Sequence, residues 1–331
     1  MDRKTNRREF VQAAGLAASG LMAAAGPLTT TGAKAQTRAS PRTMGARFRE
    51  LMNGAEPLIC ANAFDLLTAR LIEAHGFRGV FVGSSATNQE LLALPDQAIV
   101  TVGEIIEYDS VIAQNVEIPL MADVDDFGAT PLNIYRFAKK AERGGIGCAA
   151  FDDRMPLNRA TAYSVPGVFP KARMIDNIHA AADARSDMVL IARCLAPTPN
   201  NSYTEMLDRA AAYAEAGADA VWIALPTTQD YVKAADMVKK PLMAVFGNAK
   251  FPATPAALKA ARISVTQTPP MVNIALGAVD RALSELQATG RITEAQKGAL
   301  SRDVSDKVEQ VEELNARARK YNLPRGSAPE R

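Results

Sequence analysis

From residue 45 onward the chain repeats one alternation, a short apolar run followed by a longer segment with helical spacing. Each apolar run is continuous, which is typical of parallel strands covered on both faces. Eight such strands joined by seven crossovers fit a closed barrel better than an open sheet, so we predict an α/β fold, a (β/α)8 TIM barrel, over 46–290. The predicted strands are 58–63, 79–83, 120–124, 148–151, 188–192, 220–225, 242–246 and 263–268, and the predicted helices between them are 66–75, 102–115, 129–143, 171–184, 204–216, 228–239 and 255–261.

A helical extension follows the predicted barrel. Residues 272–289 continue as helix, Gly290 interrupts the pattern, and 293–321 is predicted as one long helix within the C-terminal part 291–331. Its apolar stripe needs a partner, which is either the barrel of the same chain or a second subunit. The stripe comprises Leu300, Val304, Val308, Val311 and Leu314.

The first 35 residues have the character of an export signal. Arg7 and Arg8 precede an Ala- and Gly-rich apolar run at 13–25, and small residues suited to a peptidase follow at 33–35. The pattern resembles a twin-arginine signal peptide, which implies export of a folded protein to the periplasm. An uncleaved amphipathic anchor is the alternative, although the run is too short to span a bilayer stably. A linker over 36–45 completes the predicted organisation.

The charge of the chain argues against two classes of partner. Residues 1–35 carry five basic and two acidic side chains, so their removal changes the formal net charge from +2 to −1. A near-neutral chain gives no reason to expect nucleic acid or, after signal cleavage, a membrane as partner. Cys60, Cys148 and Cys194 have neither metal-clip nor disulfide spacing, so we expect burial for all three. Cys194, which follows an arginine, is the one alternative candidate for a catalytic thiol.

The stretch 119–128 changes abruptly from apolar residues to three carboxylates and a glycine. This pattern predicts a buried strand that opens into a polar site at its C-terminal end. If Asp123 and Asp125 lie on that strand, they point to the same face and can both reach one hard cation such as Mg²⁺. The alternative is that one carboxylate caps the next helix while the others are solvated.

Polar residues also follow most of the other predicted strands. The carboxyl ends of barrel strands share one rim, so these side chains are expected to converge there. They are Asn62 and Asp65, Ser84 and Ser85, Asp152 and Asp153, Arg193, and Asn248 and Lys250. The two histidines, His75 and His179, fall in helical segments and are expected on the outside of the barrel.

Several short motifs, in order and in register from about 46 to about 285, resemble the isocitrate lyase and phosphoenolpyruvate mutase superfamily. The resemblance implies a (β/α)8 barrel, a homodimer or homotetramer with a C-terminal helix that can be swapped between subunits, and a Mg²⁺ cofactor. The motifs are 62–65 (Asn-Ala-Phe-Asp), 69–71 (Ala-Arg-Leu), 74–77 (Ala-His-Gly-Phe), 94–96 (Leu-Pro-Asp), 122–125 (Ala-Asp-Val-Asp), 191–193 (Ile-Ala-Arg) and 213–220 (Tyr-Ala-Glu-Ala-Gly-Ala-Asp-Ala).

Carried over residue by residue, the resemblance assigns roles to the predicted rim. It makes Asp123 and Asp125 the Mg²⁺ carboxylates, with Asp96 in the outer shell. Ser84 and Ser85 would offer hydroxyl and backbone N–H groups to a substrate carboxylate. Arg193, the candidate catalytic residue, would hold the substrate's oxygens, for which its planar fork is suited. A structural ion pair between Arg193 and a nearby aspartate is the alternative.

The chain also departs from the family pattern. The lyases carry a Lys-Cys-Gly-His-like loop after the fourth strand, whereas 154–164 contains neither Cys nor His and offers Arg154, Arg159 and Tyr163 instead. The family's Ile-Glu-Asp-Gln is replaced by Ala-Phe-Asp-Asp at 150–153, and Ala224 stands where a lyase glutamate is expected.

Three hypotheses follow for the function. The first is a Mg²⁺-dependent lyase that breaks a C–C bond of a small α-keto or α-hydroxy carboxylic acid, isocitrate- or methylisocitrate-like, through an enolate. The second is P–C chemistry of the phosphoenolpyruvate mutase or phosphonopyruvate hydrolase kind, which the missing loop cysteine favours. The third is a non-catalytic carboxylate-binding barrel.

Overall fold

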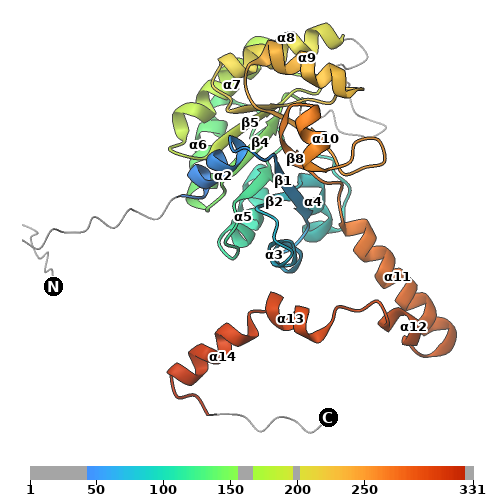
Figure 1. Cartoon of the computed structure of the whole chain (residues 1–331). Helices are drawn as coiled ribbons and strands as arrows, with labels where there is room; N and C mark the ends of the chain where they lie inside the picture. Colours follow the sequence, from blue (N-terminus) through green and yellow to red (C-terminus); the bar gives the residue numbers. More distant parts are fainter. Residues whose placement is uncertain (1–42, 156–166, 197–201, 325–331) are drawn as a thin grey trace, which may run out of the picture. The chain divides into compact units, whose positions relative to one another are not determined.

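The computed structural model describes residues 43–155, 167–196 and 202–324. The predicted signal peptide and nearly all of the linker lie outside these residues, as do Arg159 and Tyr163. The strands form a closed, fully parallel barrel in sequence order (Figure 1). The predicted α/β barrel is therefore confirmed, with every strand end within three residues of its prediction. The strands are β1 (Leu58–Ala63), β2 (Gly79–Val82), β3 (Leu120–Asp123), β4 (Cys148–Asp152), β5 (Val189–Arg193), β6 (Ala220–Trp222), β7 (Leu242–Val245) and β8 (Ile263–Gln267).

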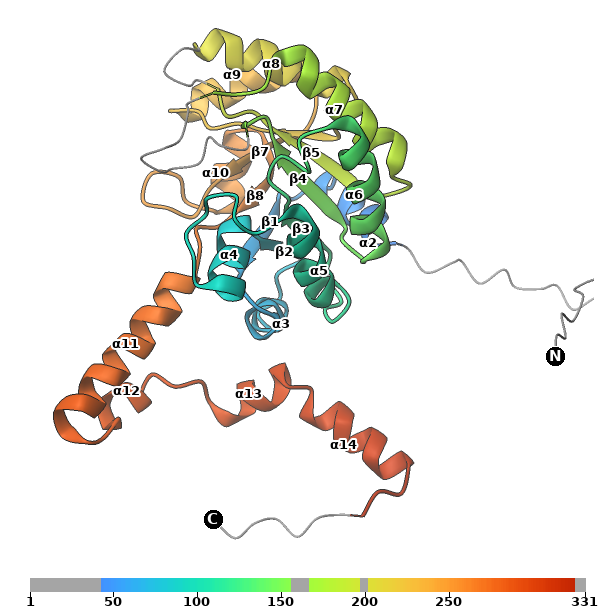
Figure 2. The same cartoon turned by 180° about the vertical axis from the view of Figure 1, so that it is seen from behind.

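Helices surround the barrel, and Figure 2 shows several of them from the opposite side. All seven predicted helices are present. Ser/Thr/Asp side chains begin several of them; Thr101, for example, caps α5 and exchanges hydrogen bonds with Glu104. The seven are α3 (Leu66–Ala74), α5 (Val102–Ala113), α6 (Pro131–Arg143), α7 (Lys171–Ala184), α8 (Tyr203–Glu215), α9 (Thr228–Val238) and α10 (Pro255–Ala260).

Two further helices were not predicted. α2 (Met44–Met52) places the buried Phe48 and Met52 against the side chains inside the barrel, so it closes the N-terminal end. α4 (Ser84–Leu92) begins directly after β2 and lies beside α5. Its sequence, Ser-Ser-Ala-Thr-Asn-Gln-Glu-Leu-Leu, has no amphipathic repeat, which is why the periodicity gave no signal.

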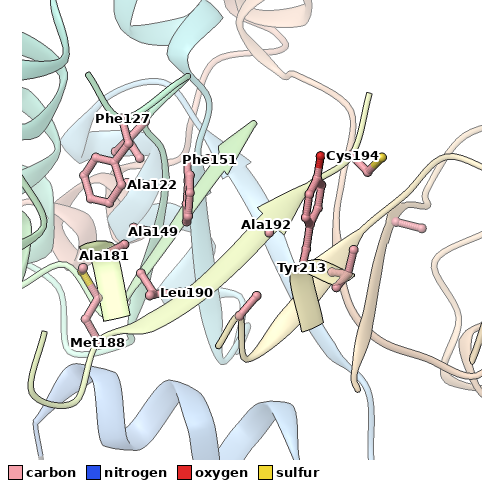
Figure 3. Close-up of a cluster of buried hydrophobic side chains, with 14 of the residues drawn as sticks. Ala122, Phe127, Ala149, Phe151, Ala181, Met188, Leu190, Ala192, Cys194 and Tyr213 are labelled. Carbon is pink, nitrogen blue, oxygen red and sulfur yellow. The ribbon is translucent and has the colours of Figure 1, made fainter. Parts of the chain in front are cut away.

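The core has two layers. The inner layer fills the barrel and includes Cys60, Phe81, Met121 and Trp222. The outer layer lies between the strands and the helices, and Figure 3 shows part of it, with Phe127 and Phe151 side by side. Because strand side chains alternate between these two layers, both faces of each strand are buried, which explains the continuous apolar runs.

The C-terminal extension differs from its prediction. α11 (Val272–Thr289) ends at Gly290 as expected, but 293–321 is not one helix. It is divided into α12 (Thr293–Gln296), α13 (Arg302–Val308) and α14 (Val311–Lys320). Ser301 caps α13 by accepting a hydrogen bond from Val304, and Gln310 has a left-handed φ of 59°, which ends the helical path.

The apolar stripe of this extension is only partly covered by the residues that the structure describes. Val308 is buried where α13 packs on α3, and the Arg70 guanidinium donates a 3.3 Å hydrogen bond to the Val308 carbonyl. Leu300 and Leu314 remain 54% and 59% exposed. Among the described residues, no helix has the length and apolar character needed to cross a bilayer.

Candidate functional site

A pocket of about 180 Å³ opens at the C-terminal ends of the strands. Five of the six predicted site residues line it, namely Ser84, Ser85, Asp96, Asp123 and Arg193. The structure thus brings together groups that are up to 109 positions apart in the chain, as the barrel topology predicts. The other lining residues are Asn62, Phe81, Gly83, Ala86, Arg154, Trp222, Gln267 and Pro270.

Arg193 is the last residue of β5 and is held between an aromatic ring and a carboxylate. Its guanidinium carbon lies 3.9 Å from the centre of the Trp222 ring, and its Nη1 lies 3.6 Å from Oδ2 of Asp123. Trp222 is itself fixed by an edge-on contact with Phe81. The ion pair that was the alternative interpretation of Arg193 therefore exists. The guanidinium nevertheless lies in the pocket, where its other donors can meet an anion.

Ser84 and Ser85 form the first turn of α4. The N–H groups of Ala86 and Thr87 donate to the carbonyl of Gly83. The N–H groups of Ser84 and Ser85, which come before them, therefore have no acceptor within the helix. Helix N-termini carry partial positive charge and bind anions. The turn is held rigidly, because the Asn88 amide donates to the Ser84 carbonyl at 2.9 Å. This turn is suited to bind a carboxylate or an enolate oxygen.

Asp125 departs from the geometry on which its prediction rested. β3 ends at Asp123, and Asp125 follows in a left-handed conformation with φ of 53°. The argument that the two carboxylates share one face of a strand is therefore wrong, and Asp125 is not among the residues that line the pocket. The two remain close, since the Asp125 N–H donates to Oδ1 of Asp123 at 3.3 Å.

Asp109 is a buried carboxyl near this site that the sequence analysis missed. It lies on α5, is fully buried, and neither of its side-chain oxygens has a hydrogen bond within the described part of the chain. Burial raises its pKa well above the usual range, and the negative charges of Asp123 and Asp125 add to the rise, while the nearby Thr87 hydroxyl opposes it without a hydrogen bond of normal geometry. The sequence did contain a sign of its burial. Asp109 lies four positions after Ile105 and three after Ile106, on the apolar face of the helix.

The two aspartates at the end of β4 are both engaged by neighbouring residues. Asp153 accepts hydrogen bonds from the Leu195 N–H at 2.9 Å and from the Tyr213 hydroxyl at 2.7 Å, with Arg209 3.9 Å away. Asp152 accepts from the Arg154 N–H at 3.1 Å. Neither carboxylate lines the pocket, whereas Arg154 does.

The remaining candidates for acid–base chemistry lie elsewhere. The three thiols are buried and free, and burial raises the pKa of the Cys194 thiol, which favours the unreactive protonated form. His75 and His179 are exposed at α3 and on α7. Neither residue lines the pocket.

The pocket suits a cation that is held partly by its ligand. Among the residues described, no three His, Cys, Asp or Glu side chains converge to form a metal site. Mg²⁺ does not require such a cage, since it is commonly bound through one or two carboxylates, water and substrate oxygens. Asp123 and Asp96 are in the pocket and provide carboxylates of this kind.

Sequence comparison identifies relatives of known activity. A family model described as phosphoenolpyruvate phosphomutase matches residues 48–287. The chain is 27% identical over 190 residues to 2,3-dimethylmalate lyase of Eubacterium barkeri, covering 57% of this chain and 65% of that protein. It is 29% identical over 215 residues to oxaloacetate decarboxylase of Pseudomonas putida (strain GB-1), covering 64% of this chain and 73% of that protein.

Solved structures of other proteins share this fold. Phosphonopyruvate hydrolase in complex with oxalate and Mg²⁺ superposes with a TM-score of 0.73 at 26% identity, covering 85% of this chain and 99% of that chain. Oxaloacetate acetylhydrolase with 3,3-difluorooxalacetate superposes with a TM-score of 0.76 at 23% identity, covering 86% of this chain and 98% of that chain. The predicted membership of the superfamily is confirmed. The prediction that the protein is an enzyme is also confirmed, since its relatives include carbon–carbon lyases. With a family model that spans most of its barrel, the chain belongs to the phosphoenolpyruvate mutase/isocitrate lyase superfamily.

Proposed function

We propose that the protein is a Mg²⁺-dependent lyase that cleaves a C–C bond of a small 2-oxo or 2-hydroxy carboxylic acid through an enolate. The observation that carries the proposal is the convergence of Arg193, the first turn of α4 and Asp123 in one pocket. A fixed guanidinium and unpaired helix N–H groups are the donors that stabilise oxyanions. The names of the relatives, which include 2,3-dimethylmalate lyase and oxaloacetate decarboxylase, support this reaction class.

Each group has a distinct part in this proposal. Arg193 binds the substrate carboxylate, and the N–H groups of Ser84 and Ser85 bind the oxygen on which negative charge develops. Asp123, with Asp96 in the outer shell, would hold Mg²⁺; the ion, when bound, lowers the energy of the enolate. The electrons of the broken C–C bond remain on the enolate fragment, which then takes a proton from solvent. The other fragment leaves with a new C=O bond, either as CO₂ from a carboxylate or as a carbonyl compound whose hydroxyl has given its proton to solvent. The pocket volume of about 180 Å³ favours short acids over extended ones.

The test is a product assay on purified protein. A panel of 2-oxo and 2-hydroxy di- and tricarboxylates is incubated with Mg²⁺, and the release of pyruvate, glyoxylate or CO₂ is measured. We expect turnover of at least one acid, lost on chelation of the metal and in Asp123→Asn. Binding of these acids without any turnover would instead indicate a carboxylate-binding barrel and would contradict the proposal.

A second candidate is hydrolysis or rearrangement of a P–C bond. It is favoured by the loop residues 154–164, which lack the lyase cysteine, and by the similarity to phosphonopyruvate hydrolase. Phosphorus NMR of the protein with phosphonopyruvate and Mg²⁺ distinguishes the two, because only P–C chemistry changes the phosphorus resonance.

We also propose that the mature protein is periplasmic and oligomeric. The twin-arginine pattern at 7–8 supports export. The exposed apolar face of α11, which includes Ile274 and Leu283 at 72% and 59% exposure, supports a homodimer or homotetramer that covers it. Fractionation of cells that express the wild type or Arg7→Lys/Arg8→Lys tests the first proposal.

A further inference from the structure

A second cleft, of about 510 Å³, lies at the opposite end of the barrel from the candidate site. Its lining includes Pro57, Pro241 and Ile263, which stand at the starts of β1, β7 and β8. The β strands, at about 3.3 Å per residue, separate the two ends. The cleft is therefore independent of the pocket that contains Arg193.

Four cationic side chains line this cleft. They are Lys239 and Lys240 after α9, and Lys259 and Arg262 at the end of α10. Lys259 pairs with Glu56, and Arg262 pairs with Asp236. The side chains of Lys239 and Lys240 make no hydrogen bond or ion pair with any described residue, so the cleft retains an excess of positive charge.

Two of these cations occupy costly backbone positions. Lys239 and Arg262 have φ values of 55° and 57°, in the left-handed region where glycine is favoured. A cation near a helix C-terminus is stabilised by the helix dipole, which explains a lysine or arginine in the last turn. The dipole does not explain why a residue other than glycine stands at a left-handed position. Lys239 follows α9 and Arg262 follows α10, and both side chains line the same cleft.

The floor of the cleft contains an irregularity in the barrel. Leu242 pairs with Ile263 and Met243 pairs with Val265, so Ser264 has no opposing residue on β7. Ser264 is half-buried and lines the cleft. Bulges of this kind occur at barrel rims and next to functional sites, where they redirect a side chain.

We propose that this cleft binds a small polyanion with at least two negative charges, such as a phosphorylated or polycarboxylate metabolite. Lys239 and Lys240 supply the unpaired charge, and Ser264 supplies a hydroxyl. The exposed ion pairs of Lys259 and Arg262 hold little free energy and can open to a ligand. The half-buried rings of Pro57 and Pro241, which line the cleft, offer apolar contacts to the ligand's carbon atoms.

Calorimetric titration of the full chain with pyrophosphate and with citrate, at constant ionic strength, tests the proposal. We expect saturable binding of at least one with a dissociation constant of about 1 mM or below, and none by acetate. Binding of pyrophosphate alone assigns a phosphate ligand, and binding of citrate alone assigns a polycarboxylate. No saturable binding of either overturns the proposal.

Matched variants locate the binding. Lys239→Glu/Lys240→Glu should weaken it by about tenfold or more, while Lys233→Glu, on α9 but outside the cleft, should change it by less than about twofold. Asp123→Asn should leave it unchanged, which separates this site from the proposed catalytic one. Equal losses in the Lys233 and Lys239/Lys240 variants, or loss of binding in Asp123→Asn, would contradict the assignment.

Discussion

The Nη1 of Arg193 lies 3.6 Å from Oδ2 of Asp123, close enough for attraction but longer than a good hydrogen bond. The guanidinium is therefore positioned by Asp123 and Trp222 without being fully occupied by them. We expect Arg193→Lys to lower kcat/KM by about 100-fold or more, because an ammonium cannot donate two parallel bonds to a carboxylate. Steady-state kinetics on the substrate found in the product assay measure this, with Lys233→Arg as control. Near-wild-type kinetics would remove Arg193 from the site.

The two metal candidates should differ in their effect. Asp123 lines the pocket and Asp125 does not, so we expect Asp123→Asn to weaken Mg²⁺ binding more than Asp125→Asn. Removal of one charged ligand commonly costs on the order of 2 kcal/mol or more, which corresponds to about 30-fold in affinity. Titration of the metal-free protein with Mg²⁺ measures both. The opposite order would assign Asp125 as the principal ligand and would require its side chain to turn into the pocket.

The buried Asp109 carboxyl predicts a pH dependence of stability. Its folded pKa is raised above the unfolded value, so its contribution to stability is greatest at low pH and is lost as pH rises through the folded pKa. In Asp109→Asn this loss is absent. We expect the free energy of unfolding of the variant, relative to wild type, to increase as the pH rises from about 4, the unfolded pKa of an aspartate, by about 1.4 kcal/mol per pH unit until the folded pKa is reached. Urea unfolding in the presence of a chelator measures this; a constant difference across the titration would mean that burial does not raise the pKa of Asp109 in the folded protein.

The hydrogen bond from Tyr213 to Asp153 joins α8 to the end of β4 inside the outer core layer. Tyr213→Phe removes one of the donors to a buried carboxyl, so we expect a loss of about 1–3 kcal/mol in the free energy of unfolding. Tyr135→Phe, at a residue that is 40% exposed, is the matched control and should change stability by less than about 0.5 kcal/mol. A similar small change in both would mean that the remaining donors satisfy Asp153.

The exposed apolar face of α11 predicts association. We expect Ile274→Glu/Leu283→Glu to convert the wild-type oligomer to a smaller species, because two charges would be buried at the interface. Light scattering after size-exclusion chromatography measures the masses. A monomeric wild type would contradict the proposed oligomer, whereas a stable oligomer of the variant would place the interface elsewhere.

Much of the fold was predictable because the strands of a covered parallel barrel have a simple signature. Continuous apolar runs located β1 to β8, and the rule that active sites gather at strand C-termini selected Ser84, Asp123 and Arg193. The tail was not predictable in this way, since an apolar repeat continued through Gln310 although the backbone turns there.

The errors in the site have local physical causes. The expectation for Asp125 assumed that this residue continues an extended strand. In the structure β3 ends two residues earlier, at Asp123, and the backbone of Asp125 is left-handed. Asp109 was missed because the two carboxylates that influence it, Asp123 and Asp125, belong to another part of the chain. They become its neighbours only in the folded barrel. The Arg193–Trp222 contact likewise joins two adjacent strands, β5 and β6, whose alignment no local pattern reveals.

Trp222 is the single tryptophan of the chain, and it forms a wall of the pocket beneath Arg193. All indole emission of the protein therefore originates at the place where an acid would bind. A ligand that draws the guanidinium away from the ring changes the surroundings of the fluorophore directly. Occupancy of the pocket can thus be followed by intrinsic fluorescence, without a label and before any substrate is known.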